Sequence, residues 1–191
     1  SDLTRYFSME EAVFCGASMG EEFSPGSSMD YSNTNFTLLA MILENATGID
    51  YWTFVQDSII DHLGLSNTEI PTGDTIQSAH MGCYWNMPPM IDFTIVDPSL
   101  YKGWAEVVST PSDLNSFHSA LRTPDVLVSA ANYQRMSSLF SPATWYGLGN
   151  EVHTMGTNSY TGHSGDVGNT SGMFYCDLVS SIVSNGYYVS Y

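Results

Sequence analysis

The sequence contains very few basic residues. Its 191 residues include 20 Asp and Glu but only 4 Lys and Arg, which gives a formal net charge of -16 at pH 7. Nucleic-acid binding needs Lys and Arg to replace the counterions of the phosphates, and docking on anionic membranes needs basic patches. The charge balance therefore argues against both kinds of partner and favours a strongly solvated surface or a saline habitat.

Metal-binding patterns are scarce as well. The 3 cysteines, Cys15, Cys83 and Cys176, contain no Cys-x-x-Cys pair, so a zinc site is not expected and at most one internal disulfide can form. The acidic pairs are short, and the sequence has neither an EF-hand loop nor a His-Glu-x-x-His motif. We expect no metal and no other cofactor.

Long apolar runs are also missing. Hydrophobic residues make up 43% of the chain, but Ser, Asn, Asp and Gly interrupt them, so no membrane insertion is predicted. Ser1 is followed by no signal-peptide pattern, which predicts an artificial, processed or fragment end. Sequons at Asn35, Asn45 and Asn169 point to a secreted protein, extracellular or periplasmic, without showing whether they carry glycans.

Apolar periodicity predicts helices in the first part of the chain. Phe36, Leu39, Ala40 and Leu43 share one face of a helix that Gly48 would end. Short helices are expected over 9–14 and, after a Ser129 cap, over 130–139. Asp50 is expected to cap a helix over 51–63 that directs Tyr51, Phe54, Val55 and Ile59 inward. Thr110 is expected to cap another helix, which directs Leu114, Phe117 and Leu121 inward.

The last part of the chain has the pattern of strands. Residues 172–176 and 181–183 fit strands, and turns are expected at Gly156, at 165–166 and at 185–186. Helices followed by an antiparallel sheet predict an α+β fold. We expect one domain over 1–191, with a mainly helical region with loops and short strands over 1–142 and sheet strands over 143–191.

Two stretches carry candidate chemistry. In Tyr31-Ser32-Asn33, an extended loop would direct Tyr31 and Asn33 into one cleft. A tyrosine there shuttles a proton if a nearby cation lowers its pKa, and an amide holds a substrate carbonyl. In Gly162-His163-Ser164-Gly165, the histidine offers a charge or hydrogen bond for a substrate carboxylate, and Gly165 leaves room beside the strand.

Each of these residues also has a plain structural reading. Tyr31 is one of 12 tyrosines and suits a turn, Asn33 suits a turn or a helix cap, and His163 suits a hydrogen-bonded strand position. The remaining histidines show no ligand spacing, so we interpret them as structural or exposed: His62, His80, His118 and His153. Gly162 to Asp166 does not match the Gly-x-Ser-x-Gly signature of Ser-His-Asp hydrolases.

Taken in order, the motifs resemble the penicillin-binding serine hydrolases, which include class C β-lactamases, D-alanyl-D-alanine carboxypeptidases, D-aminopeptidases and related esterases. Tyr31-Ser32-Asn33 matches their Tyr-x-Asn motif, and His163-Ser164-Gly165 matches their Lys/His-x-Gly motif 132 residues later (163 minus 31). The histidine form is closer to the carboxypeptidase branch. Segments around the motifs look like the family's framework: 25–26, 38–39, 44–48, 63–65, 109–114 and 146–149.

The resemblance implies a β-lactamase/DD-peptidase-like fold and acyl transfer to amides or esters through an acyl-serine. By carry-over, Tyr31 would be the proton shuttle, and Asn33 and His163 would bind the substrate. Gly165 would keep the strand open, and the N–H of Asp166 would donate to an oxyanion. The carboxylate of Asp166 departs from the family's pattern, because it would stand near that oxyanion.

The family's Ser-x-x-Lys motif precedes Tyr-x-Asn, and no lysine precedes Tyr31 here. We therefore expect the nucleophile, its helix and the first strands to be absent, and the chain alone to be inactive. A stripped sheet exposes an edge and an apolar face, which predicts a complementary N-terminal segment or another protein as partner. Small peptides, β-lactams or esters are the expected substrates if the assembly is active.

Two alternatives remain open from the sequence. Ser99-Leu100-Tyr101-Lys102 fits Ser-x-x-Lys literally, but Pro98 and Gly103 flank it, so a chance match in a loop is the preferred interpretation. In the second alternative, the chain is a degenerate, non-catalytic relative that serves as a binding or structural module in an extracellular assembly.

Overall fold

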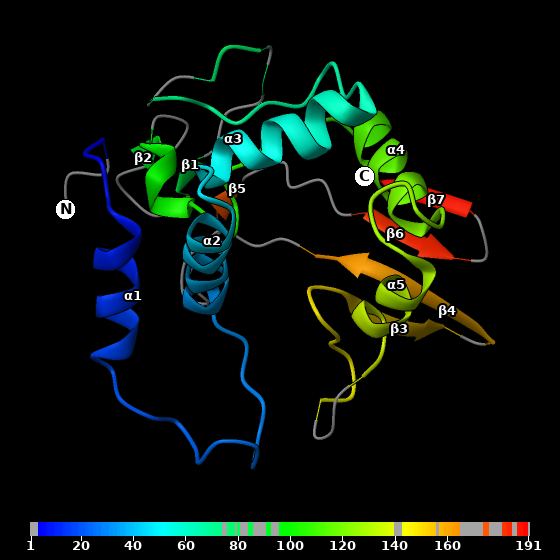
Figure 1. The fold of residues 1–191 in the computed structure, drawn as a ribbon, viewed down its shortest axis with the longest axis horizontal. Helices are drawn as coiled ribbons and strands as arrows, with labels where there is room; N and C mark the ends of the chain where they lie inside the picture. The colour runs from blue at the N-terminus through cyan, green and yellow to red at the C-terminus, as the bar shows by residue number, and fades with distance from the viewer. Residues whose placement is uncertain are drawn as a thin grey trace.

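A computed structural model describes residues 4–73, 76–78, 80, 84–85, 91–92, 96–139, 143–155, 157–164, 174–175, 181–184 and 187–190. Helices occupy the left and upper part of Figure 1, and α4 and α5 lie beside a sheet on the right. The helices are α1 (Met9–Ala17), α2 (Asn33–Thr47), α3 (Tyr51–Val55) continued by the π-helix η1 (Gln56–Asp61), the 3-10 helix η2 (Pro98–Tyr101), α4 (Pro111–Arg122) and α5 (Ala130–Met136). None of the described helices is long and apolar enough to cross a bilayer.

The predicted caps begin and end the helices as expected. The side chain of Asp50 accepts hydrogen bonds from the N–H groups of Trp52 and Thr53 at the start of α3. Thr110 and Ser129 accept comparable bonds at the starts of α4 and α5. Gly48 ends α2 in the left-handed conformation, with φ of 70°. Side-chain capping thus confirms the helix starts predicted from Asp, Thr and Ser.

One predicted helix face is wrong in part. Ala40 is buried, but Leu39 is 56% exposed, and Thr37 takes a buried position instead. The Thr37 hydroxyl donates to the carbonyl oxygen of Lys102, 3.1 Å away. Gly103 permits this approach, because its φ is 99° and a Cβ there would lie 2.9 Å from the carbonyl oxygen of Phe36. The face of α2 that packs within this chain is therefore rotated away from Leu39.

The π-helix changes which residues of the next helix reach the core. An extra residue per turn rotates the chain, so Ile60 is 4% exposed, whereas the predicted core residue Ile59 is only half-buried. Gly64 then ends the helical run with φ of 64°. Ile60, Leu65 and Ile70 form a buried cluster, against which Trp52, Val55, Leu63 and Phe117 pack.

Two antiparallel sheets complete the described fold. The larger has the order β3-β4-β6-β7, formed by β3 (Glu151–Met155), β4 (Asn158–His163), β6 (Ser181–Ser184) and β7 (Tyr187–Ser190). The smaller has the order β2-β1-β5, formed by β1 (Tyr84–Trp85), β2 (Ile91–Asp92) and β5 (Phe174–Tyr175). Helix α4 packs against β6 and β7, as the right side of Figure 1 shows. The predicted α+β arrangement is confirmed, while its assignment to one domain stays a prediction.

Candidate functional site

Tyr31 and His163 lie together although 132 residues separate them (163 minus 31). Tyr31 precedes α2, His163 ends β4, and the centroids of their rings are 5.9 Å apart. Tyr31 also packs on Phe36 at 5.6 Å, and 36% of its surface is exposed. The two side chains singled out from the sequence therefore form one partly open cluster.

The other predicted site residues are less fully placed. Asn33 is the first residue of α2 and is half-buried, so the cap position belongs to Ser32. Ser32 is extended, with φ of -141° and ψ of 125°, as the alternation between Tyr31 and Asn33 requires. Gly165 and Asp166 lie outside the described residues, and so does the predicted oxyanion donor.

Tyr146 is a member of this cluster that the sequence did not single out. Its hydroxyl lies 3.0 Å from Nε2 of His163. The ring is 7% exposed and meets the rings of Tyr31 and His163 edge-on, at 5.5 and 5.6 Å. Three aromatic side chains thus contact one another pairwise.

The turn 146–149 explains how Tyr146 reaches this position. A Cβ at Gly147 would overlap the carbonyl oxygen of Met136, so only glycine fits there. Gly149 has φ of 75°, a left-handed conformation that favours glycine. The turn brings Tyr146 opposite Glu151 in an isolated antiparallel bridge. The Tyr-Gly-Leu-Gly pattern was the available sequence signal, but it predicted only a connecting segment of the family and no site residue.

Glu151 was also missed, and it supplies a buried negative charge. It is 7% exposed; its Oε1 accepts a 2.6 Å hydrogen bond from the Ser164 hydroxyl, and its Oε2 lies 2.8 Å from Nε2 of His153. Nδ1 of His163 is 3.7 Å from Oε1. Burial opposes ionisation, but the bonds from Ser164 and His153 outweigh it and hold the pKa of Glu151 below its usual value. The sequence signal was Glu151 and His153 two residues apart on one strand.

The electrostatics of Tyr31 differ from the expectation. A proton shuttle was expected to have a pKa lowered by a nearby cation, yet the pKa of Tyr31 is raised, first by burial and then by the charge of Glu151. The hydrogen bond with Tyr146 opposes this shift without reversing it. Within the described residues, Tyr31 therefore stays protonated.

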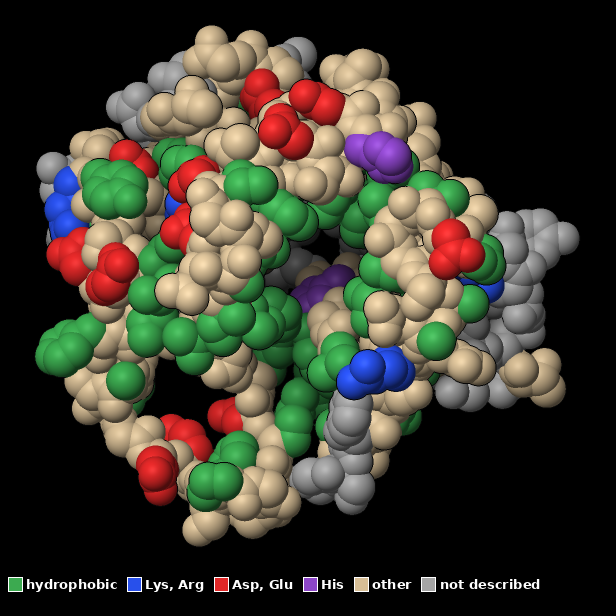
Figure 2. Space-filling view, in the orientation of Figure 1, with side chains coloured by type: hydrophobic (Ala, Val, Ile, Leu, Met, Phe, Trp, Pro, Cys, Tyr) green, Lys and Arg blue, Asp and Glu red, His purple; other side chains and the backbone are tan. Residues whose placement is uncertain are grey.

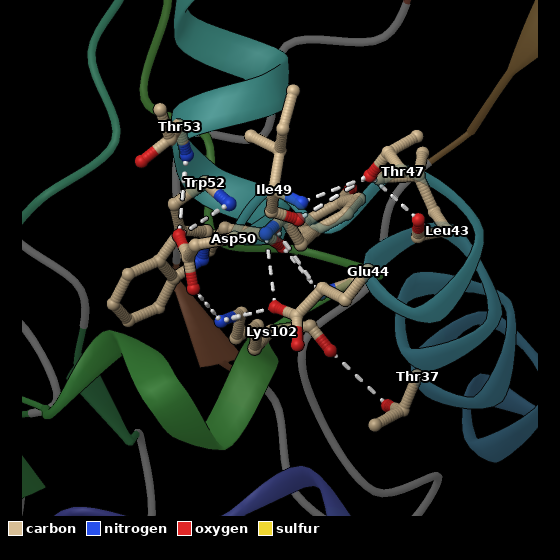
Figure 3. Close-up of polar contacts among 12 residues, drawn as sticks. Thr37, Leu43, Glu44, Thr47, Ile49, Asp50, Trp52, Thr53 and Lys102 are labelled. Atoms are coloured by element: carbon tan, nitrogen blue, oxygen red, sulfur yellow. Dashed lines mark hydrogen bonds and ion pairs between the residues drawn. The ribbon is translucent and has the colours of Figure 1, made fainter.

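Lys102, the only lysine in the sequence, is used elsewhere. Its ammonium lies 2.8 Å from Oδ2 of Asp50 and 3.0 Å from Oε1 of Glu44, and 4.7 Å from the ring centroid of Trp52 (Figure 3). The side chain is only 6% exposed. These three partners lie on α2, on α3 and at the cap between the two helices. Lys102 therefore connects both helices to the end of η2.

Ser99 is likewise committed to structure. It lies on η2, capped by Asp97, where a loop had been predicted. Ser99 is 3% exposed, and its Oγ accepts a 2.7 Å hydrogen bond from the N–H of Phe7. The buried Ser99 hydroxyl and the Lys102 ammonium held by two carboxylates both have structural partners. This is what we expect of a chance match to Ser-x-x-Lys.

A cavity of about 580 Å³ adjoins the cluster. Figure 2 shows the centre of this face hollowed, with a histidine inside and hydrophobic side chains around it. Most of its lining is apolar and comes from the α3–η1 helix, α4 and α5, while the strand side contributes Gly162 and His163. Asn150 also lines the cavity, and its buried Nδ2 has no hydrogen-bond partner among the described residues.

The remaining histidines differ in their surroundings. His62 and His80 are exposed, and His118 is buried, with its pKa lowered by burial and then by Arg122. These three fit the structural or exposed interpretation, whereas His153 touches the cluster through Glu151. Within the described ranges, no group of three or more His, Cys, Asp or Glu side chains is placed to hold a metal ion.

The chain matches the family profile described as Beta-lactamase over residues 4–186. It is 26% identical over 183 residues to a D-aminopeptidase of Cereibacter sphaeroides (strain ATCC 17029 / ATH 2.4.9), covering 86% of this chain and 33% of that protein. The chain thus spans about a third of this curated relative.

Solved structures show the same fold. A D-stereospecific amidohydrolase from Streptomyces sp. superposes with a TM-score of 0.85 at 24% identity, covering 98% of this chain and 56% of the other. A D-amino acid amidase from Ochrobactrum anthropi SV3, complexed with L-phenylalanine amide, superposes with a TM-score of 0.70 at 24% identity, covering 87% and 51%. The resemblance inferred from the motifs is confirmed: the chain belongs to the Beta-lactamase family of serine hydrolases.

Proposed function

We propose that this chain supplies the Tyr-x-Asn and His-x-Gly side of an acyl-transfer site that cleaves amide or ester bonds. The observation that carries the proposal is the convergence of Tyr31 and His163, whose ring centroids are 5.9 Å apart. The nucleophilic serine and its lysine come from a segment outside these 191 residues. The parent protein is here the natural protein that contains this chain together with that segment.

In this proposal, Tyr31 moves a proton between the serine, the substrate and the leaving group. Its pKa is raised by burial and by Glu151, so it needs a cation to become an effective base. The lysine of the missing Ser-x-x-Lys motif would supply that charge. Asn33 would hold the substrate's carbonyl, beside Gly165 and the N–H of Asp166, and His163 would hold the carboxylate of those substrates that have one, such as small peptides and β-lactams.

Amides of amino acids are the substrate class that we favour, with small peptides, β-lactams and esters as further candidates. The support comes from relatives named D-aminopeptidase, D-stereospecific amidohydrolase and D-amino acid amidase. A buried carboxylate at Glu151 and a net charge of -16 also favour a substrate that carries an ammonium group over a purely anionic one.

The surface of this chain supports a complementary segment as partner. Leu38, Leu39 and Ile42 are 43%, 56% and 55% exposed on α2, which is unusual for three neighbouring aliphatic side chains. The apolar cavity beside His163 contains the amide of Asn150, whose Nδ2 has no hydrogen-bond partner in the part of the chain that the structure describes. A segment that covers these groups would remove the free-energy cost of exposing the aliphatic side chains and that of burying an amide without a hydrogen bond.

One observation favours a second candidate, a non-catalytic relative that acts as a binding or structural module. Burial and then the charge of Glu151 raise the pKa of Tyr31, and the only lysine in the sequence is held by Glu44 and Asp50. A site that has lost its nucleophile has no need to keep its tyrosine ready to ionise. In either case an extracellular or periplasmic location stays a proposal, for which glycans on the exposed Asn35 and Asn45 would be direct evidence.

Covalent labelling separates the two candidates. The parent protein and the isolated chain are each treated with a fluorophosphonate and a β-lactam, and the adduct is located by mass spectrometry. Acyl transfer predicts an adduct on a serine upstream of this chain and none on residues 1–191. Y31F should slow labelling by about 10²- to 10⁴-fold, whereas Y133F, which loses a bond to Thr161 outside the cluster, should not. An unlabelled parent protein would favour the binding module, and an adduct within residues 1–191 would contradict both candidates.

A further inference from the structure

Glu151 reaches across the sheet to Ser164. In the antiparallel register of β3 and β4, Glu151 lies opposite Gly162, so Ser164 is its diagonal neighbour, a position that a long side chain can reach. Gly162 has no side chain to block the way. Oε1 of Glu151 accepts a 2.6 Å hydrogen bond from the Ser164 hydroxyl, one residue after β4 ends. The middle residue of the His-x-Gly motif is therefore held by a side chain, beyond the last residue pair of the two strands.

Both carboxylate oxygens of Glu151 have partners. Oε2 lies 2.8 Å from Nε2 of His153 while Oε1 holds Ser164, and Glu151 is only 7% exposed. Burial opposes ionisation, but the bonds from Ser164 and His153 outweigh it and keep the pKa of Glu151 below its usual value, so the group is ionised near neutral pH. A carboxylate only accepts hydrogen bonds. The single hydrogen of the Ser164 hydroxyl is therefore used on Glu151.

The Ser164 hydroxyl is left as an acceptor. A hydroxyl has one hydrogen and two lone pairs, so only the lone pairs of its Oγ are available to another group. Ser164 is exposed, and the Oε1 atom of Glu151 that it binds also lies 3.7 Å from Nδ1 of His163. The Ser164 hydroxyl and the His163 ring thus meet at one oxygen atom. A group bound beside His163 therefore lies close to an acceptor at Ser164.

We propose that Ser164 is a specificity-determining contact and that Glu151 is the positioning residue that turns its hydroxyl into an acceptor. A substrate that presents an N–H donor at this point, such as a terminal carboxamide, gains a hydrogen bond to Ser164. A terminal carboxylate has no hydrogen to donate, and it meets the lone pairs of Ser164 and the charge of Glu151. The inference rests on the proposed function for the presence of a substrate beside His163. It ranks carboxamides above small peptides that end in a free carboxylate.

The test compares D-alanyl-D-alanine with its terminal amide, D-alanyl-D-alaninamide, which differ only in the terminal group. In the wild-type parent protein, the amide should have the higher kcat/KM. E151Q frees the hydrogen of Ser164, because the glutamine amide can donate to Oγ, and the hydroxyl can then donate to a carboxylate. The ratio of the two kcat/KM values should fall about 10- to 100-fold, as expected for one hydrogen bond to a charged group. An unchanged ratio in E151Q, or a wild-type preference for the free acid, would overturn the inference.

Two further variants show whether Glu151 acts through Ser164. E106Q is the matched control, because Glu106 is 5% exposed and accepts its backbone bonds from Gly103 and Ala105, away from the cluster; its ratio should equal that of wild type. S164A should narrow the ratio, and adding E151Q to it should change little more. An equal effect of E151Q with and without the Ser164 hydroxyl would assign the discrimination to charge alone and overturn the inference. Since Ser164 is exposed, S164A tests the contact even if urea unfolding shows that E151Q is unfolded.

Binding separates this inference from the proposed function. If the parent protein turns over neither dipeptide and no serine is labelled, the proposed function fails, and isothermal titration calorimetry then measures the affinity for both dipeptides. Tighter binding of the amide in wild type, with the preference lost in E151Q and S164A and kept in E106Q, supports the inference on its own. Equal binding of the two dipeptides, or binding of neither, overturns it. In a parent protein that is labelled and active, an unchanged kcat/KM ratio in E151Q overturns the inference alone.

Discussion

Removing the ammonium of Lys102 should destabilise the fold without affecting acylation. K102M keeps the apolar stem of the side chain but leaves Asp50 and Glu44 without their cation, which lies 2.8 and 3.0 Å from their oxygens. Breaking a buried ion pair costs about 3–5 kcal/mol. The side chains of Asp50 and Glu44 are 50% and 29% exposed, so water replaces part of the loss and we expect about 2–3 kcal/mol.

Urea unfolding of the parent protein measures this loss. With a slope of about 2 kcal/mol per molar, the midpoint should fall by roughly 1 M. R5M is a matched control, because it removes a cation from the exposed pair of Arg5 with Glu11 and should leave the midpoint nearly unchanged. Fluorophosphonate labelling should be normal in K102M, whereas a catalytic Ser99-x-x-Lys102 would require its loss.

The pH dependence of the effect follows from Asp50. Burial raises the pKa of Asp50, but the hydrogen bond and charge of Lys102 outweigh burial and lower it overall. A lowered folded-state pKa means stability that is present above the unfolded value of about 3.9 and is lost as the pH falls. The deficit of K102M should therefore shrink below about pH 4. A deficit no larger than that of R5M, or one that persists undiminished in acid, would refute this account of Lys102.

Two further substitutions test buried positions away from Lys102. Burial holds the pKa of Glu106 above its usual value, and hydrogen bonds from backbone N–H groups and from the Tyr51 side chain offset it only in part. Ionising Glu106 therefore costs folding free energy, and this cost grows as the pH rises. E106Q should therefore gain stability relative to wild type between pH 4 and pH 8 in urea titrations; a constant difference would contradict this. G147A should lose about 1–3 kcal/mol, because its Cβ would overlap the carbonyl of Met136, while G73A, with open space around it, should lose far less on thermal unfolding.

Local signals predicted the elements of this fold well. Caps at Asp50, Thr110 and Ser129 are short-range interactions that need no knowledge of the tertiary structure. The burial of Ile60 and the exposure of Leu39 were missed for the opposite reason. A π-turn changes which residue of the helix is buried at Ile60, and the surface on which α2 packs determines the exposure of Leu39. Neither effect can be predicted from apolar periodicity.

The candidate site was predicted only where a motif marked it. Tyr31 and His163 were found because each lies in a short pattern, and the fold brings them together. Tyr146 was placed in the framework, since its glycines explain the turn by themselves. The spacing of Glu151 and His153 was too weak a signal to place Glu151 in the site, because its effect depends on a cross-strand register that puts it opposite Gly162.

The charge of Glu151 also bears on the ionisation of Tyr31. Burial and then the charge of this carboxylate raise the pKa of the Tyr31 phenol, which is the wrong direction for a proton shuttle. Oε1 of the same carboxylate lies 3.7 Å from Nδ1 of His163. Burial and the charge of Glu151 therefore oppose ionisation of Tyr31. A cation next to Tyr31 would favour ionisation of the phenol and would reverse that balance.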